Sequence, residues 1–437
     1  MSSPYVPNTD ADRRAMLERI GVASVDALFD DIPSRVRNPR LTLPPPLSEP
    51  ELVSELTRMA ARNRSVAEMP CFLGAGAYRH FIPSVVDYVI RQGAFATAYT
   101  PYQPEISQGT LQSIFEFQSL VCELTGMDVA NAGMYDGASA LAEACLMAVR
   151  ITGRERLAVL STVNPAYERV VQTYAEGHTL PVDILEPHAP SVTGEHACLV
   201  VQNPNFFGCF EDVAALGKRA RDAGALFIAV PDAISLGMFK PPGEYGADIV
   251  VAEGQPLGIP LSFGGPYVGL FATRQEHIRQ MPGRLVGRTT DADGRTGYVL
   301  TLQTREQHIR RERATSNICT NEQLCALAAT VYLCALGKQG LRRVAELCHH
   351  KTHYAADRIS DLQGYSLPFA DRTFFQEFVV SCPRPPEEIN VRLLERGIIG
   401  GLDVSGRIDD SMLLCVTEMN TRDEIDGLVD VLGEIGS

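Results

Sequence analysis

The sequence has little lysine, and the four lysines among its 437 residues are Lys218, Lys240, Lys338 and Lys351. None of them follows a buried strand, and all four are expected on the solvated surface, so none is placed to form a Schiff base with an aldehyde. The eleven cysteines form no C-x-x-C pair and are scattered through apolar runs, which indicates reduced core thiols. No apolar run approaches the about 20 residues that cross a bilayer.

Basic residues are also fewer than acidic residues. The chain carries 39 basic against 53 acidic residues, a net charge of −14, which argues against nucleic acid or an anionic membrane as the main partner. The N-terminus lacks the hydrophobic block of a signal peptide, so a cytoplasmic location is expected. The one cluster of metal-ligand residue types is Cys348, His349, His350 and His353, and no second ligand pair accompanies it, so no metal site is predicted.

The pattern of the chain predicts three parts. Residues 1–70 form an N-terminal arm of short helical pieces broken by a proline-rich link. Residues 71–304 alternate apolar strands with amphipathic helices, which predicts an α/β domain with a mostly parallel sheet covered on both faces. Residues 305–437 read as a smaller α+β domain, with long helices beginning near Arg305 and a final helix opened by a capping box from Thr421 to Glu424.

Three features of the large domain follow one another in a meaningful order. Gly137 and Ser139 open a helix, where free N–H groups favour a phosphate, although the same residues also serve as a plain N-cap. Asp232 ends an apolar strand, where it could pair with a pyridinium nitrogen or cap the next turn. Gln255 then stands where a pyridoxal-phosphate enzyme carries its lysine, and an amide forms no Schiff base. The order predicts an aspartate-aminotransferase-like cofactor cleft that has lost its tether.

Four blocks carry a resemblance to a known family: residues 5–21, 72–86, 97–144 and 304–324. Together they resemble the α subunit, or subunit 1, of the split glycine decarboxylase, the P-protein of the glycine cleavage system. The likeness extends over essentially the whole chain. In that family a second subunit carries the lysine in a motif like H-K-x-F-x-I-P-x-G-G-G-G-P, and here Gln255 falls on the lysine.

The resemblance implies the fold, the activity and the partners. It implies a pyridoxal-phosphate fold type I domain and a heterotetramer of two α and two β chains, in which the β subunit binds pyridoxal 5'-phosphate. The complex would decarboxylate glycine and pass the aminomethyl group to the lipoyl arm of the H-protein. The chain alone is expected to be inactive and to hold no catalytic residue of its own.

The residues expected to reach the partner's active site lie in one proline-punctuated loop. Its aromatic, amide and carboxylate side chains are Tyr99, Tyr102, Gln103, Glu105 and Gln108. Loops of this kind on a rigid scaffold often carry function. A subunit contact without a catalytic part is an equally good interpretation.

Arg305, Arg310 and Arg313 could bind a substrate carboxylate, but a salt-bridged hinge is the favoured interpretation. His80 is interpreted as a packed polar residue and not as an acid or base. Two other functions stay open at this point. One is an independent pyridoxal-phosphate transferase that uses another lysine, and the other is a scaffolding pseudoenzyme.

Overall fold

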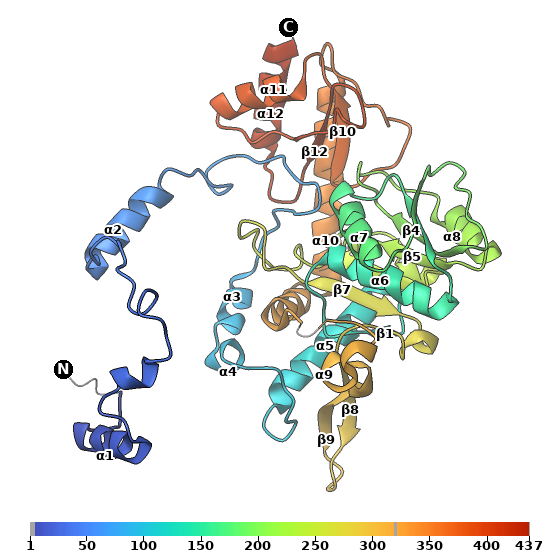
Figure 1. Ribbon diagram of the computed structural model, residues 1–437. Coiled ribbons are helices and arrows are strands. Elements are labelled where there is room, and N and C mark those ends of the chain that lie inside the picture. Colours follow the sequence, from blue (N-terminus) through green and yellow to red (C-terminus); the bar gives the residue numbers. More distant parts are fainter. Residues whose placement is uncertain (1–4, 319–320, 437) are drawn as a thin grey trace. The chain divides into compact units, whose positions relative to one another are not determined.

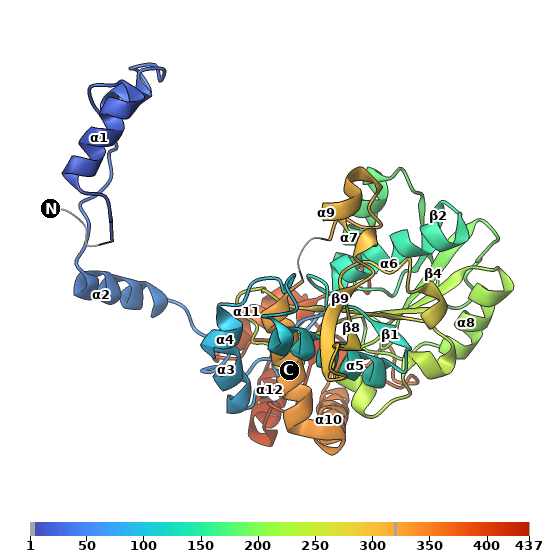
Figure 2. The same ribbon diagram turned by 90° about the horizontal axis from the view of Figure 1, so that it is seen from below.

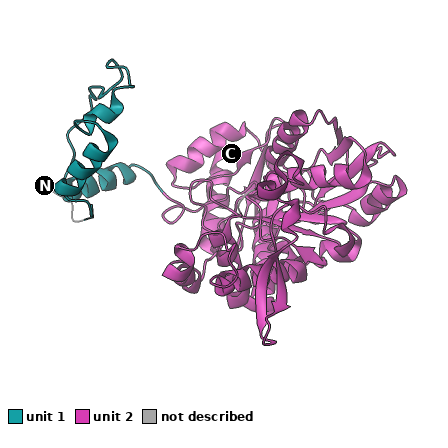
Figure 3. Cartoon of the chain, turned by 60° about the horizontal axis from the view of Figure 1, so that its bottom comes forward, with its two compact units in different colours: residues 1–64 teal, residues 65–437 magenta. Residues whose placement is uncertain are grey.

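The computed structural model describes residues 5–318 and 321–436, and the chain divides into two compact units, residues 1–64 and 65–437 (Figure 3). The first unit contains α1 (Asp10–Ile20), a 3-10 helix (Asp26–Phe29) and α2 (Glu49–Ala60). Thr9 and Ser48 cap the two α-helices through capping boxes. None of residues 5–64 is buried, so the described part of this unit has no core of its own.

The second unit is built on a seven-stranded sheet with the order β1-β7-β6-β5-β4-β2-β3 (Figure 1). Its strands are β1 (Val129–Ala130), β2 (Arg156–Leu160), β3 (Val182–Leu185), β4 (His196–Gln202), β5 (Leu226–Val230), β6 (Ile249–Glu253) and β7 (Gly269–Thr273). The pairs from β3 to β6 are parallel, and β7 runs antiparallel to both β6 and β1. This mostly parallel sheet confirms the predicted α/β class.

Helices cover both faces of the sheet. The helices α6 (Gly137–Thr152) and α7 (Pro165–Gly177) pack together on one side, and α5 (Gln108–Thr125) and α8 (Val213–Asp222) lie on the other (Figure 2). The short helices α3 (Ser84–Ile90) and α4 (Gly93–Ala96) precede α5. Almost every residue of the central strands is buried, which is why these strands read as continuous apolar runs.

A second, smaller sheet forms in the C-terminal part of the chain. It has the antiparallel order β11-β12-β10, with β10 (Glu377–Ser381), β11 (Leu402–Asp403) and β12 (Ser411–Cys415). The helices α11 (Pro386–Glu395) and α12 (Arg422–Gly436) accompany it, and Thr421 and Glu424 form the predicted capping box. The smaller core that includes Phe72, Ile389 and Leu428 belongs to this part. The domain boundary at residue 305 stays a prediction.

The prediction of a long helix beginning near Arg305 is wrong. Residues 303–313 form short turns of 3-10 helix around α9 (Gln307–Arg310), and Arg311 adopts a positive φ of 54°, which ends α9. The long helix α10 begins at Gln323 and runs to Ser360, with a break in helical backbone at Gly337. The hairpin of β8 (Leu285–Thr290) and β9 (Thr296–Thr301) was not predicted.

By length and composition, α10 is the one helix among the described residues that could cross a membrane. Its buried residues pack in both cores, from Ala326 and Tyr332 in the larger to Ala355 and Ile359 in the smaller. No membrane assignment follows from it. The ten cysteines that the structure describes are free thiols, and Cys319 lies outside the described residues.

Candidate functional site

Of the predicted cleft residues, Asp232 lines a small central cavity at the carboxyl ends of β5 and β6, and the others lie beside this cavity. Asp232 follows β5, Gln255 follows β6, and Gly137 and Ser139 open α6 beside them. The central cavity has a volume of about 40 Å³, and its polar lining includes Tyr78, Tyr167, Asp232, Glu253, Gln376 and Glu377. The structure therefore places the predicted cleft residues at or beside one site, as their order in the chain indicated.

Gln255 is buried, with 2% of its surface exposed, and its side chain links two loops. Its Oε1 accepts a hydrogen bond from the N–H of Tyr78 at 2.8 Å, and its Nε2 donates to the carbonyls of Tyr78 at 2.9 Å and Ile259 at 2.8 Å. The amide therefore joins the loop that carries Tyr78 to the loop after β6. A lysine amine has no acceptor and could not make this two-way contact.

The N-terminus of α6 is filled by carboxylates of the chain itself. The N–H of Gly137 donates to Glu253 Oε2 at 2.9 Å, and the N–H of Ser139 donates to Asp136 Oδ1 at 2.7 Å. The helix dipole and these N–H groups favour an anion, and Glu253 and Asp136 already supply one. A phosphate at this helix end would meet the carboxylate of Glu253.

Two more carboxyl groups border the central cavity. Asp232 accepts from the N–H of Ser235 at 2.7 Å and from Gln376 Nε2 at 3.0 Å. Glu377 accepts from the N–H of Ala75 at 2.6 Å and from the Tyr78 hydroxyl at 2.7 Å. Burial raises the pKa of Glu377 to about 7, burial also raises the pKa of Glu253 to about 7, and it raises the pKa of Asp232.

Pyridoxal phosphate does not fit the residues of this cavity. Pockets for molecules of that size have volumes of about 300 Å³ or more, far above the volume found here. No lysine lines the central cavity. Lys218 pairs with Asp222 at 2.5 Å, and Lys351 donates to backbone carbonyls after β12. The arrangement leaves neither a tether nor a phosphate position.

The loop expected to meet a partner lies on the surface. Tyr99 is 79% exposed and Tyr102 is 42% exposed, and Gln103 and Glu105 are also exposed. Arg284 fixes the position of Tyr102, because the Tyr102 hydroxyl accepts a hydrogen bond from Arg284 at 2.9 Å. The loop thus exposes aromatic side chains, and one of them is anchored to the protein beneath it.

Arg284 belongs to a buried charged cluster beneath this loop, which the sequence did not indicate. Arg284 and Glu306 are 4% and 7% exposed, and Arg284 Nε lies 3.6 Å from Glu306 Oε2. His308 approaches the same Glu306 oxygen at 3.5 Å and meets the edge of the Tyr102 ring. Arg284 Nη1 and Glu306 Oε1 have no hydrogen-bond partner among the described residues. Buried charges of this kind are costly unless they are paired.

Gln108 has a structural contact. Its Nε2 donates to the carbonyls of Pro104 at 2.7 Å and Tyr298 at 2.9 Å, and its Oε1 accepts from the N–H of Tyr298 at 2.8 Å. The side chain thus pairs with β9 in the manner of a neighbouring strand. This contact ties the start of α5 to the β8–β9 hairpin.

The three arginines near residue 305 have separate surroundings. Arg305 is 9% exposed, and it donates to the carbonyls of Leu302, Met281 and Gly283. Arg310 donates to the carbonyl of Thr304, and Arg313 lies on the surface. Since Arg305 is committed to backbone carbonyls, the structure brings no arginine fork together here.

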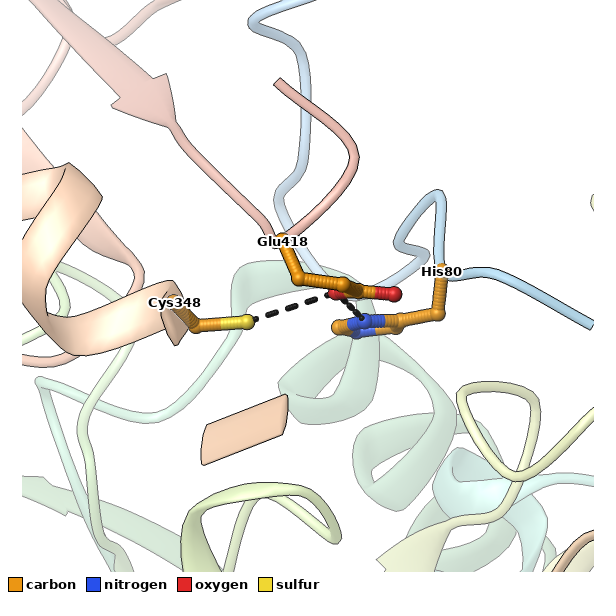
Figure 4. Close-up of side chains that lie close together, drawn as sticks. All are labelled: His80, Cys348 and Glu418. Atoms are coloured by element: carbon orange, nitrogen blue, oxygen red, sulfur yellow. Dashed lines mark hydrogen bonds and ion pairs between the residues drawn. The ribbon is translucent and has the colours of Figure 1, made fainter. Parts of the chain in front are cut away.

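His80 belongs to a buried cluster with Cys348 of α10 and Glu418, which follows β12 (Figure 4). His80 Nδ1 lies 2.7 Å from Glu418 Oε2, and the Cys348 thiol donates to the same oxygen at 3.5 Å. The N–H of Phe81 donates to Glu418 Oε1 at 2.7 Å. The donor types suit a metal ion, but these contacts satisfy the carboxylate without one. The absence of a metal site stays a prediction.

The histidines that follow Cys348 on α10 face another way. The rings of His349 and His353 have centroids 4.1 Å apart, and His353 stacks on Phe374 at 4.1 Å. His353 Nδ1 also contacts the carbonyl of His349 at 2.8 Å. The structure therefore separates Cys348 from the histidines that adjoin it in the sequence.

Sequence reasoning missed Glu253, Gln376 and Glu377. Glu253 could have been found, because it ends an apolar strand two residues before Gln255, at the edge where parallel strands place functional groups. Glu377 begins β10 and Gln376 directly precedes it, and nothing in their local pattern indicates a contact with the loop at Ala75.

The fold and this site define a class: a pyridoxal-phosphate fold type I protein whose own cavity does not fit the cofactor. A sphingosine-1-phosphate lyase of Burkholderia pseudomallei shares the fold at a TM-score of 0.65 and 15% identity, covering 92% of this chain and 94% of that chain. A glutamate decarboxylase of Lactobacillus brevis shares it at 0.63 and 12% identity, covering 91% and 94%. These likenesses carry the fold alone.

The particular family follows from closer matches. The profile described as "Glycine cleavage system P-protein" matches residues 3–432, so the chain belongs to that family. It is 54% identical to the "Probable glycine dehydrogenase (decarboxylating) subunit 1" of Thermomicrobium roseum, covering 98% of this chain and 99% of that protein. A crystal structure of glycine decarboxylase (P-protein) in inhibitor-bound form matches at a TM-score of 0.93 and 44% identity, covering 99% of this chain and 100% of that chain. The predicted resemblance is confirmed.

Proposed function

We propose that this chain is the subunit without lysine of a two-subunit glycine dehydrogenase (decarboxylating) of the cytoplasm. A β subunit would bind pyridoxal 5'-phosphate in a heterotetramer of two chains of each kind. The complex would decarboxylate glycine and transfer the aminomethyl group to the lipoyl arm of the H-protein. The curated relatives named subunit 1, of about the same length, support this division of labour.

One observation carries the proposal: the central cavity is closed to the cofactor at two independent points. Gln255 replaces the amine that would tether pyridoxal phosphate, and Glu253 accepts the α6 N–H group that would meet the phosphate. The chemistry that the cofactor supplies, an electron sink for decarboxylation, must therefore come from another chain. This argues against a transferase that works alone with one of the remaining lysines.

The loop with Tyr99 and Tyr102 is the proposed wall of the partner's active site. It is exposed, rich in aromatic and amide groups, and fixed from beneath by Arg284. Arg284 Nη1 and Glu306 Oε1 lack hydrogen-bond partners among the described residues.

Glycine–bicarbonate exchange tests the proposal directly. The full chain, its co-expressed partner and the mixture are assayed with lipoylated H-protein, and only the mixture is expected to exchange. Exchange by this chain alone would refute the division of labour.

A variant of the complex separates an active-site wall from a scaffold. Tyr99→Ala is expected to lower the turnover of the assembled complex, with Ile106→Ala, at a similarly exposed position of the same loop, as the matched control. Size-exclusion chromatography checks that both variants still assemble. Unchanged turnover in Tyr99→Ala would favour a scaffolding role.

A further inference from the structure

The central cavity is lined by acidic groups without a basic counterpart. Asp232, Glu253 and Glu377 border it, and no lysine or arginine of the described chain lines it. Buried carboxylates are costly unless a cation or a proton neutralises them. Burial raises the pKa of Asp232 and His80 opposes this rise, although the Nδ1 of His80 lies against Glu418. The lining itself therefore carries no positive charge.

One oxygen of the lining lacks a hydrogen-bond partner among the described residues. Gln376 is 2% exposed and lines the central cavity, and its Nε2 donates to Asp232. Its Oε1 accepts no hydrogen bond from any described residue. An unpaired buried carbonyl is costly, so its place beside three carboxylates indicates that a cation or another donor is missing from the cavity.

The size of the cavity limits what can enter. A volume of about 40 Å³ accommodates a water molecule or a bare ion, since one probe sphere needs about 10–15 Å³. Calcium requires six to eight oxygens at about 2.3–2.6 Å, in a tight cluster. The three carboxylates are not among the described groups whose ligand atoms all lie within 4.8 Å of one another. A larger, singly charged ion suits such spacing better.

We propose that the central cavity binds one monovalent cation larger than Na⁺, namely K⁺ or NH₄⁺, between Asp232, Glu253, Glu377 and Gln376 Oε1. The oxygen lining matches the preference of hard cations. In a cofactor-binding protein of this fold the site binds an anionic phosphate, whereas the acidic lining of this cavity favours a cation. This inference is independent of the proposed function, because it concerns the folded chain and not the activity of the complex.

Unfolding of the full chain at pH 8.5 in different salts tests the proposal. Urea unfolding is followed at equal concentrations of KCl, NaCl, NH₄Cl and tetramethylammonium chloride, because tetramethylammonium is too large for the cavity. At about ten times its dissociation constant, the bound cation raises the folding equilibrium constant about tenfold. K⁺ or NH₄⁺ is expected to do so. Equal unfolding in all four salts would overturn the proposal.

Two variants locate the effect. Glu377→Gln removes one charge of the lining and is expected to abolish most of the cation-dependent gain. Glu176→Gln, at an exposed position of α7, is the matched control and should retain the gain. A gain that persists in Glu377→Gln places the cation elsewhere and contradicts the proposal.

A crystal soaked in rubidium chloride gives a readout that does not depend on any variant. Rubidium replaces potassium and has an anomalous signal. A peak among Asp232, Glu253 and Glu377 is the expected result. Well-ordered side chains around a cavity without such a peak would overturn the site, even where the salts alter stability by a general ionic effect.

Discussion

Glu377→Gln is expected to stabilise the chain at alkaline pH and to flatten its pH dependence. Burial raises the pKa of Glu377 from 4.5 to about 7, so the folded chain binds this proton more tightly than the unfolded chain does. The stabilisation from the proton is complete below pH 4.5 and is lost as the pH rises through 7. With 1.36 kcal/mol for each pKa unit, the loss at pH 8.5 is about 3 kcal/mol.

The glutamine can keep both hydrogen bonds of the glutamate. Its Oε1 can accept from the N–H of Ala75, and its Nε2 can donate to the Tyr78 hydroxyl, which accepts in place of donating. The amide does not titrate, so the variant avoids the loss. Relative to the parent chain, its free energy of unfolding should rise by about 2.5 kcal/mol between pH 5 and pH 8.5, because part of the loss has already occurred at pH 5.

Urea unfolding from pH 5 to pH 8.5 measures the effect. Tetramethylammonium salts are used throughout, so that no small cation offsets the negative charge. Glu176→Gln, which removes an exposed carboxylate, should follow the pH profile of the parent chain. Parallel profiles for the parent chain and Glu377→Gln would refute the reasoning, because they would mean that Glu377 is ionised at no cost in the folded chain.

Two further substitutions test separate parts of the site. Gln255→Lys should not create a pyridoxal-phosphate site, because the N-terminus of α6 is already filled; a visible absorbance band after incubation with the cofactor, bleached by borohydride, would contradict this. Gln108→Ala should destabilise the chain by about 0.5–1.5 kcal/mol in urea unfolding, because the N–H and C=O of Tyr298 exchange the amide for water at this exposed position. An unchanged unfolding midpoint would show that water replaces the amide at no cost.

Apolar patterning explains how much of the fold could be predicted. The strands β2, β4, β5, β6 and β7 are buried almost throughout, so each reads as a short apolar run. The other strands carry weaker signals in the sequence. β1 has two residues, β3 is only partly buried, and much of the β8–β9 hairpin is exposed.

The long helix predicted to begin near Arg305 is absent for a physical reason. Its residues favour helix locally, but Arg305 is drawn into the protein by three backbone carbonyls and Arg311 takes a positive φ. Tertiary contacts of this kind override a local preference. The same contacts hold Glu306 beside Arg284, under the exposed tyrosine loop.

Two residues only two positions apart explain why pyridoxal phosphate does not fit the central cavity. Gln255 removes the tether, and Glu253 fills the helix terminus that would take the phosphate, so restoring either residue alone leaves the other obstacle in place. The sequence revealed the first obstacle because a missing lysine is visible in a strand-and-loop pattern. The second depends on the contact of Glu253 with Gly137, which only the fold creates. Because both obstacles lie inside the cavity, the proposed contribution of this chain to catalysis falls to its surface, and the exposed loop with Tyr99 and Tyr102, which Arg284 holds in place, is the surface that we propose for it.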